Sequence, residues 1–259
     1  MIHLEGLLAG YGGLDILRGV DLHVEQGSVN CIVGPNGAGK STVLKTISGL
    51  LRPRHGSIVI DGVDLAGKPP ATILHAGVVQ VPQRNGLFAK LTVRHNVLMG
   101  AYIQRRRRKH LAQRYDELAQ RFPLLAQRPD APAGALSGGQ RRTVEFARAM
   151  MLDPKVVLLD EPTLGLDPLS LAIVRDSVRA LHSGGVTVLM VEQNVRFGLA
   201  LADQATVMSA GRVALTGTAD EIRDKPDLMD VFFGAARHGH SGASQGGRRV
   251  IERERRDLG

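Results

Sequence analysis

The 259-residue sequence contains one cysteine, Cys31, no tryptophan and only 3% aromatic residues. A single thiol excludes a disulfide framework and a zinc site built on several cysteines, and it suits a reducing cytosol. No apolar run approaches the ~20 residues that a membrane-spanning helix needs. The first ten residues also lack the basic flank and long apolar stretch of a secretion signal. We therefore expect a cytosolic protein that can meet a membrane only at its surface.

The positive charge of the sequence is confined to two segments. Residues 101–128 carry a net charge of +6 and residues 235–259 a net charge of +3, whereas the rest of the chain sums to −1. The arginine run at residues 105–108 has two interpretations, a solvated surface or a patch attracted to anionic lipid. Nucleic-acid binding is not expected, because the sequence shows no aromatic platform on which bases could stack.

Apolar runs alternate with helical patterns along most of the chain. Strands are expected at residues 28–33, 57–60, 77–81, 156–160, 186–191 and 205–208, and helices at 40–50, 169–181 and 194–201. Continuous apolar strands are typical of a parallel sheet that is covered on both faces, and their alternation with helices predicts an α/β fold.

The strand pattern disappears between residues 87 and 151, where alanine, leucine, glutamine and arginine dominate. This region predicts a helical subdomain at 87–151, inserted between core segments 1–86 and 152–234. The composition changes again after residue 234 to glycine, serine, histidine and arginine, which cannot bury enough apolar area to offset the entropy cost of ordering. We expect a disordered basic tail at 235–259, with a frayed helix at 250–257.

A glycine-rich loop follows the apolar strand at 28–33 and precedes a helical pattern, and it matches the phosphate-binding motif G-x-x-x-x-G-K-[ST]. The glycines let backbone N–H groups approach polyphosphate, and the helix N-terminus adds partial positive charge. Lys40 is expected to reach the terminal phosphates, and the Ser41 hydroxyl to bind Mg²⁺. The nucleotide-binding residues predicted here are Gly34, Pro35, Asn36, Gly37, Ala38, Gly39, Lys40, Ser41 and Thr42.

Two carboxylates, Asp160 and Glu161, end the apolar strand at 156–160. Ligands of α/β sheets bind at the carboxyl ends of the strands, so Asp160 is a candidate Mg²⁺ ligand. Glu161 would then be free to polarise an attacking water as a general base. Together with the glycine-rich loop, this pair predicts hydrolysis of the nucleotide rather than binding alone.

A second anion site is predicted where Ser137, Gly138, Gly139 and Gln140 open a helical stretch. A serine hydroxyl and two bare glycine N–H groups at a helix N-terminus suit a phosphate. With the two motifs above, this order makes the sequence, over residues 2–234, resemble the ABC-type ATP-binding subunits, whose core is a P-loop NTPase fold with an inserted helical subdomain. The resemblance implies that two subunits enclose two ATP molecules, each bound by one chain's glycine-rich loop and the other chain's Ser137–Gly139 segment.

The same resemblance gives roles to further residues. Tyr11 matches the aromatic residue that stacks on adenine, and Gln83 the glutamine that contacts Mg²⁺ and water. Asp167 matches the loop that signals between the two subunits. The family usually has a histidine near the γ-phosphate where this sequence has Gln193, and an amide can donate a hydrogen bond there but cannot carry a proton or charge. We therefore expect nucleotide binding to be intact and hydrolysis to continue with Glu161 as the base. The rate of hydrolysis is the property that Gln193 puts in question.

Within the family, the string at residues 191–194 and the region 200–222 resemble the smaller ATP-binding subunit of bacterial branched-chain amino acid importers. This implies a second ATP-binding subunit in a homodimer or heterodimer, membrane permease subunits, a solute-binding protein, and a location on the cytoplasmic face of the cell membrane. The permease would contact the surface around Leu87, Phe88 and Thr92. Transport of urea or short amides, and a regulator without a permease, are alternatives; relatives that handle DNA carry long insertions that this sequence lacks.

Overall fold

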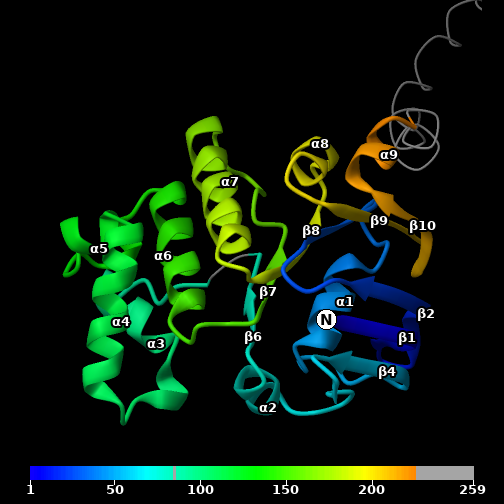
Figure 1. The fold of residues 1–259 in the computed structure, drawn as a ribbon, viewed down its shortest axis with the longest axis horizontal. Coiled ribbons are helices and arrows are strands. Elements are labelled where there is room, and N and C mark those ends of the chain that lie inside the picture. The colour runs from blue at the N-terminus through cyan, green and yellow to red at the C-terminus, as the bar shows by residue number, and fades with distance from the viewer. Residues whose placement is uncertain (84–85, 226–259) are drawn as a thin grey trace, which may run out of the picture. The chain divides into compact units, whose positions relative to one another are not determined.

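A computed structural model describes residues 1–83 and 86–225, and its contacts divide the chain into the units Met1–Arg223 and Asp224–Gly259. The predicted tail at 235–259, with its helix at 250–257, lies outside the described residues. In the first unit, strands form two sheets (Figure 1). No helix among residues 1–83 and 86–225 is long and apolar enough to cross a membrane.

The larger sheet has six strands in the order β10-β9-β3-β8-β7-β6, and all neighbours are parallel except β10 and β9. Its strands are β3 (Val29–Val33), β6 (Val78–Val81), β7 (Val156–Asp160), β8 (Thr187–Glu192), β9 (Gln204–Ser209) and β10 (Arg212–Thr218). The α/β class with a parallel sheet is confirmed. The carboxyl ends of β3, β6, β7 and β8 meet at one edge, and this edge carries the candidate site.

The smaller sheet is antiparallel and has the order β2-β1-β4-β5. Its strands are β1 (Ile2–Tyr11), β2 (Leu14–Val24), β4 (His55–Ile60) and β5 (Val63–Asp64). All six predicted strands are present to within two residues, but β1, β2, β5 and β10 were missed. In β1 the alternation of apolar and polar residues is broken by a register shift between Leu4 and Leu7, where Gly6 takes φ 55°.

Helix α1 (Lys40–Ile47) lies between the two sheets and contacts strands of both. The predicted helix at 40–50 was too long, because α1 is capped at Ser48 and Gly49 follows with φ 73°, a left-handed conformation that stops a helix. Figure 1 shows α7 (Pro168–Ser183), α8 (Val195–Leu199) and α9 (Ala219–Arg223) along the other face of the larger sheet. The prediction at 194–201 was also too long, since Asn194 is the N-cap of α8 and accepts a hydrogen bond from Phe197 N–H.

In the part that the structure describes, the chain between β6 and β7 contains helices and connecting loops but no strand, apart from one isolated bridge between Thr92 and Pro132. It contains α3 (Val93–Met99), α4 (Arg108–Arg121), α5 (Leu124–Gln127) and α6 (Gly138–Met150), with short 3₁₀ turns at Tyr102–Gln104 and Ala133–Ala135; α2 (Pro70–His75) precedes β6. Figure 1 shows these helices grouped in green on the β6 side of the larger sheet. Helix α6 contacts α3, α5, α7 and β6, and so joins this group to the sheet.

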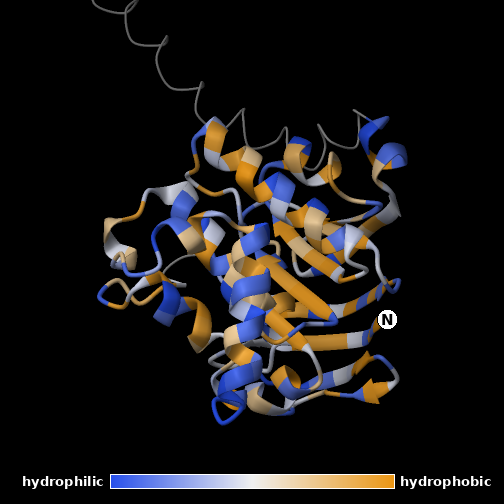
Figure 2. Cartoon of the chain, turned by 60° about the vertical axis from the view of Figure 1, so that its left-hand side comes forward, coloured by the Kyte–Doolittle hydropathy of each residue, from blue (hydrophilic) through white to orange (hydrophobic). Residues whose placement is uncertain are grey.

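The core lies between the two sheets, around α1. It is built from the inward-facing residues of β1, β2 and β4, the buried face of α1 and strands of the larger sheet. Figure 2 shows hydrophobic strands beside helices that carry both hydrophobic and hydrophilic residues. Fully burying one leucine or isoleucine stabilises a fold by roughly 1.5–3 kcal/mol, so this core fixes the strand ends on which the site is built.

Candidate active site

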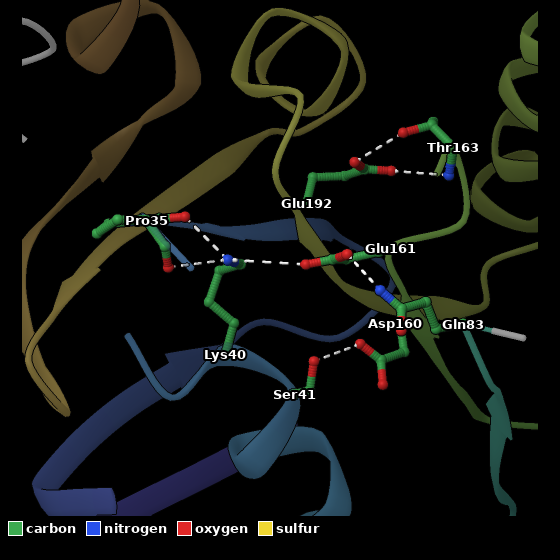
Figure 3. A network of polar contacts seen from close by, with 9 residues as sticks. Pro35, Lys40, Ser41, Gln83, Asp160, Glu161, Thr163 and Glu192 are labelled. Atoms are coloured by element: carbon green, nitrogen blue, oxygen red, sulfur yellow. Dashed lines mark hydrogen bonds and ion pairs between the residues drawn. The ribbon is translucent and has the colours of Figure 1, made fainter. Parts of the chain in front are cut away.

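The glycine-rich loop connects β3 to α1, and the backbone conformation and packing of the loop require glycine at three positions. Gly37 and Gly39 take φ 82° and 100°, which side chains disfavour. A Cβ at Gly34 would lie 2.3 Å from the Met208 carbonyl oxygen. Lys40 folds back over this loop, and its Nζ donates hydrogen bonds to the carbonyl oxygens of Gly34 at 2.8 Å and Pro35 at 3.2 Å (Figure 3). The loop is therefore preformed, with its cation held above it.

Ser41 and Asp160 come from different elements and meet at the end of β7. The Ser41 hydroxyl donates to Asp160 Oδ1 at 2.7 Å, as Figure 3 shows. Burial raises the pKa of Asp160, and the hydrogen bond from Ser41 opposes that shift. The pair offers hard oxygen donors, a hydroxyl and a carboxylate, which are the ligands that Mg²⁺ prefers beside phosphate oxygens. The donor set therefore fits Mg²⁺ bound by few protein ligands.

Glu161 is held in place from three directions. Its backbone takes φ 43°, and its N–H donates to the Val191 carbonyl oxygen of β8 at 3.0 Å. Its side chain lies 3.8 Å from Lys40 Nζ and accepts a hydrogen bond from Gln83 Nε2 (Figure 3). A carboxylate fixed beside a cation and an amide can orient a water molecule for attack on phosphate.

Lys40, Ser41, Gln83 and Glu161 border one open cavity of about 570 Å³, whereas Asp160 is not among its lining residues. Its lining combines residues predicted from the sequence with Ile16 and Leu164, to which the sequence had given no role: Tyr11, Ile16, Asn36, Gly37, Gly39, Lys40, Ser41, Thr42, Gln83, Glu161, Leu164 and Gln193. Tyr11 is 47% exposed at the end of β1, and Lys45 Nζ lies 5.8 Å from its ring centroid. A cavity with this volume and this mixture of groups suits a nucleotide.

Ser137, Gly138, Gly139 and Gln140 do not line this cavity. They begin α6 in a reciprocal cap, in which Ser137 Oγ accepts from Gln140 N–H and Gln140 Oε1 accepts from Ser137 N–H. Asp167 is also outside the cavity lining and caps α7, accepting hydrogen bonds from Leu169 N–H, Ser170 N–H and Ser170 Oγ, which lower its pKa. A Cβ at Gly139 would lie 2.6 Å from Ser170 Oγ, so these two helix starts lie side by side.

Glu192 is a polar residue of this region to which the sequence had given no role. It ends β8 and is only 1% exposed, and burial raises its pKa to about 7. Its carboxylate accepts hydrogen bonds from the backbone and side chain of Thr163, 29 residues away. The sequence does contain one signal for Glu192, since a carboxylate ends an apolar run there as at Asp160. The spacing along the chain could not show that its hydrogen-bond partner is Thr163.

Residues 17–164 match the family model described as ABC transporter. This chain belongs to the ABC transporter family. The chain is 35% identical to the high-affinity branched-chain amino acid transport ATP-binding protein BraG of Pseudomonas aeruginosa, over 90% of this chain and 100% of that protein. It is 38% identical to the probable branched-chain amino acid transport ATP-binding protein LivF of Archaeoglobus fulgidus, over 90% of this chain and 99% of that protein.

Other members of the ABC transporter family are similarly close. The lipopolysaccharide export system ATP-binding protein LptB of Haemophilus influenzae is 35% identical over 89% of this chain and 95% of that protein. The crystal structure of a nucleotide-free ATP-binding cassette from an ABC transporter has a TM-score of 0.81 at 27% identity, covering 90% of this chain and 99% of that one. The predicted fold class is confirmed, and the chain is an ATP-binding subunit and an ATPase of this family.

Proposed function

We propose that this ATPase powers an importer of branched-chain or other hydrophobic amino acids. The similarity to BraG and LivF supports this proposal, since it extends over 90% of this chain and nearly the whole of each relative. The similarity to LptB, whose name states lipopolysaccharide export, favours a second candidate, export of an amphipathic solute. Import of urea or short amides and a regulatory role without a permease remain the alternatives from the sequence.

The proposed roles of the site residues follow their positions in the cavity. ATP phosphates would bind the loop from Gly34 to Thr42, with Lys40 neutralising the terminal phosphate charge. Adenine would stack on Tyr11, which is exposed at the cavity rim. Glu161 would accept the proton of the attacking water, with Gln83 and Gln193 orienting that water and the phosphate. Ser41, Asp160 and Gln83 would hold Mg²⁺, which supplies charge neutralisation at the phosphates when it is bound.

The site of one chain is proposed to be incomplete without a second ATP-binding subunit. The Ser137–Gly139 segment lies outside the cavity of its own chain, so it is available to the nucleotide of a partner. Asp167, beside that segment, would form part of the same interface. Either a homodimer or a heterodimer satisfies this arrangement, and a heterodimer with a histidine-bearing partner would compensate for Gln193.

The permease is proposed to dock on the helices between β6 and β7, which would make the chain a peripheral protein of the cytoplasmic face of the inner membrane. Phe88 is 50% exposed there, with the Arg148 guanidinium 5.8 Å from its ring centroid. An exposed aromatic residue beside a cation suits a protein contact. We propose the same boundaries as the sequence suggested, a helical subdomain at 87–151 within core segments 1–86 and 152–234. A solute-binding protein would act through the permease.

Isolating the membrane complex tests this function most directly. Affinity purification of the tagged full-length chain from membranes should recover integral permeases, and solute-stimulated ATP hydrolysis should respond to leucine, isoleucine or valine. Response to urea or short amides would favour that alternative, and response to a lipid-linked saccharide would favour export. Recovery of no integral partner would contradict the transport role.

A further inference from the structure

Glu192 makes a pair of hydrogen bonds that joins two functional segments. Its Oε2 accepts a hydrogen bond from Thr163 Oγ1 at 2.8 Å, and its Oε1 accepts one from Thr163 N–H at 3.2 Å (Figure 3). The backbone N–H of Asn194 also hydrogen-bonds this carboxylate. Thr163 is 7% exposed and Glu192 1% exposed, so water has little access to these bonds. The interaction ties the segment after β7 to the end of β8.

The position of Thr163 gives this contact a consequence for catalysis. Thr163 lies two residues after Glu161 and four before Asp167. Glu161 is already tied to β8 through its N–H and the Val191 carbonyl oxygen, and it is held in a left-handed conformation that costs free energy in a residue other than glycine. The segment from Glu161 to Thr163 is therefore fixed to β8 at both ends.

The residues that follow Thr163, beginning with Leu164 and Gly165, are not closely packed against the segment that follows β8. A second cavity of about 260 Å³ separates them from the segment that follows β8, and Leu164, Gly165, Gln193 and Asn194 line this cavity together with Glu161, Thr163 and Glu192. Gly165 takes φ 71°, and no atom lies within 4 Å of where its Cβ would be. Since packing is open here, the hydrogen bonds of Glu192, together with the bond from Glu161 N–H to the Val191 carbonyl oxygen, restrain the segment against β8.

We propose that Glu192 is a positioning residue of the ATPase site. By holding Thr163, it fixes the Glu161 carboxylate toward Lys40 and Gln83, and it sets the start of the segment that leads to Asp167. Glu192 itself does not line the nucleotide cavity, whereas its neighbour Gln193 does. Glu192 thus links the segment after β7, which contains Thr163, to the segment after β8, which begins with Gln193.

Four single variants of the full-length chain, and one double variant, test the proposal. Thr163→Val removes the hydroxyl donor with little change in volume, and Glu192→Gln removes one of the two acceptor oxygens. Thr163→Ser keeps both donors. The matched control is Thr206→Val, because Thr206 is 1% exposed in β9 and its Oγ1 has no hydrogen-bond partner among the residues that the structure describes. Measured quantities are kcat, KM for ATP, melting temperature and amide hydrogen exchange in residues 161–167.

Losing a buried hydrogen bond to the Glu192 carboxyl group should lower kcat about tenfold in Thr163→Val and Glu192→Gln. KM should stay within about twofold, because the phosphate loop is untouched. Combining the two changes should lower kcat no further than the more affected single variant, since both remove the same contact. Thr163→Ser should retain most of kcat, and Thr206→Val all of it.

Two results would overturn the proposal. One is a normal kcat in Thr163→Val and Glu192→Gln with only a lowered melting temperature, which would make the contact structural. The other is an equal loss in Thr206→Val. Hydrogen exchange tests the same point without turnover: faster exchange at residues 164–167 in Thr163→Val than in Thr206→Val supports the proposal, and unchanged exchange contradicts it.

Discussion

Lys40 Nζ and Glu161 Oε1 lie 3.8 Å apart, with side chains that are only 4% and 10% exposed. Burial lowers the pKa of Lys40, and the nearby carboxylates of Glu161, Asp160 and Glu192 oppose that shift. The lysine is therefore surrounded by negative charge before any phosphate arrives. Each further anion that binds beside it must compete with Glu161 for the same ammonium group, so nucleotide binding and the position of the base are linked.

Replacing Glu161 with glutamine should separate ATP binding from hydrolysis. The amide keeps the shape of the side chain but cannot accept a proton at neutral pH. Loss of a general base should slow turnover by about 10²–10⁴-fold. ATP affinity, measured with a fluorescent analogue, should be retained or increased, because an anion beside Lys40 has been removed. Turnover near the wild-type rate would exclude Glu161 as the base.

Replacing Gln193 with histidine should increase turnover. Gln193 lies at the rim of the nucleotide cavity, directly after the buried end of β8. An imidazole can share a proton with phosphate or water, whereas the glutamine amide cannot. We expect an increase of about tenfold in kcat, less than the roughly 10²–10⁴-fold of a full acid–base contribution. Gln127→His, at an exposed position of α5, is the matched control; equal rates in both variants would show that Gln193 does not limit hydrolysis.

The contact between α6 and α7 should depend on Gly139. A Cβ there would lie 2.6 Å from Ser170 Oγ and 3.0 Å from Ile173 Cδ1. Gly139→Ala should therefore lower the free energy of unfolding by about 1–3 kcal/mol. Gly138→Ala is the control, because its Cβ would meet only Leu166 at 3.7 Å and alanine favours a helix. Denaturant unfolding of both variants measures the difference, and equal stabilities would contradict the packing argument.

The sequence predicted those parts of the fold and site whose determinants are continuous along the chain. Strands β7 and β8 of the larger sheet are nearly continuous apolar runs, and the phosphate loop from Gly34 to Thr42 is one segment. Strands β1 and β2 of the antiparallel sheet were missed, and in β1 irregular pairing at Gly6 disrupts the alternation. Contacts across the fold were also out of reach: Gln83 and Glu161 are 78 residues apart, and Thr163 and Glu192 are 29 apart. These residues meet only because their strands are neighbours in the folded sheet, and the sequence does not show which strands are neighbours.

The arginine run should bind anionic membranes. Residues 105–109 are exposed around the start of α4, and the Arg105 guanidinium lies 4.8 Å from the Tyr102 ring centroid. Each basic residue near an anionic surface contributes about 1 kcal/mol, screened by salt. Neutralising residues 105–108 should weaken sedimentation with phosphatidylserine vesicles at low salt. Neutralising Arg175 and Arg179, exposed on α7, is the control, and unchanged binding in the first variant would reject this role.

Glu192 should make stability depend on pH. Its pKa is about 7 in the folded chain, above the ordinary glutamate value of 4.5, because desolvation outweighs the hydrogen bonds from Thr163 and Asn194. The nearby charge of Glu161 also raises this pKa, and Lys40 and Cys31 lie within electrostatic reach. Glu192 therefore binds a proton more tightly in the folded state than in the unfolded state. Protonation of Glu192 raises the free energy of unfolding at low pH, and this contribution is lost as pH rises through 7.

The expected size of this effect is at most about 3 kcal/mol. Glutamine at position 192 does not titrate, so the wild type and Glu192→Gln should differ in free energy of unfolding by an amount that changes with pH. This difference, wild type minus variant, should fall between pH 5 and pH 8 in guanidinium titrations. Subtracting the variant cancels the contribution of Asp160, whose pKa burial also raises. A difference that stays constant over this range would show that Glu192 is already charged in the folded state at pH 5. The three hydrogen bonds to its carboxylate, which lower the pKa, would then outweigh the loss of solvation, which raises it.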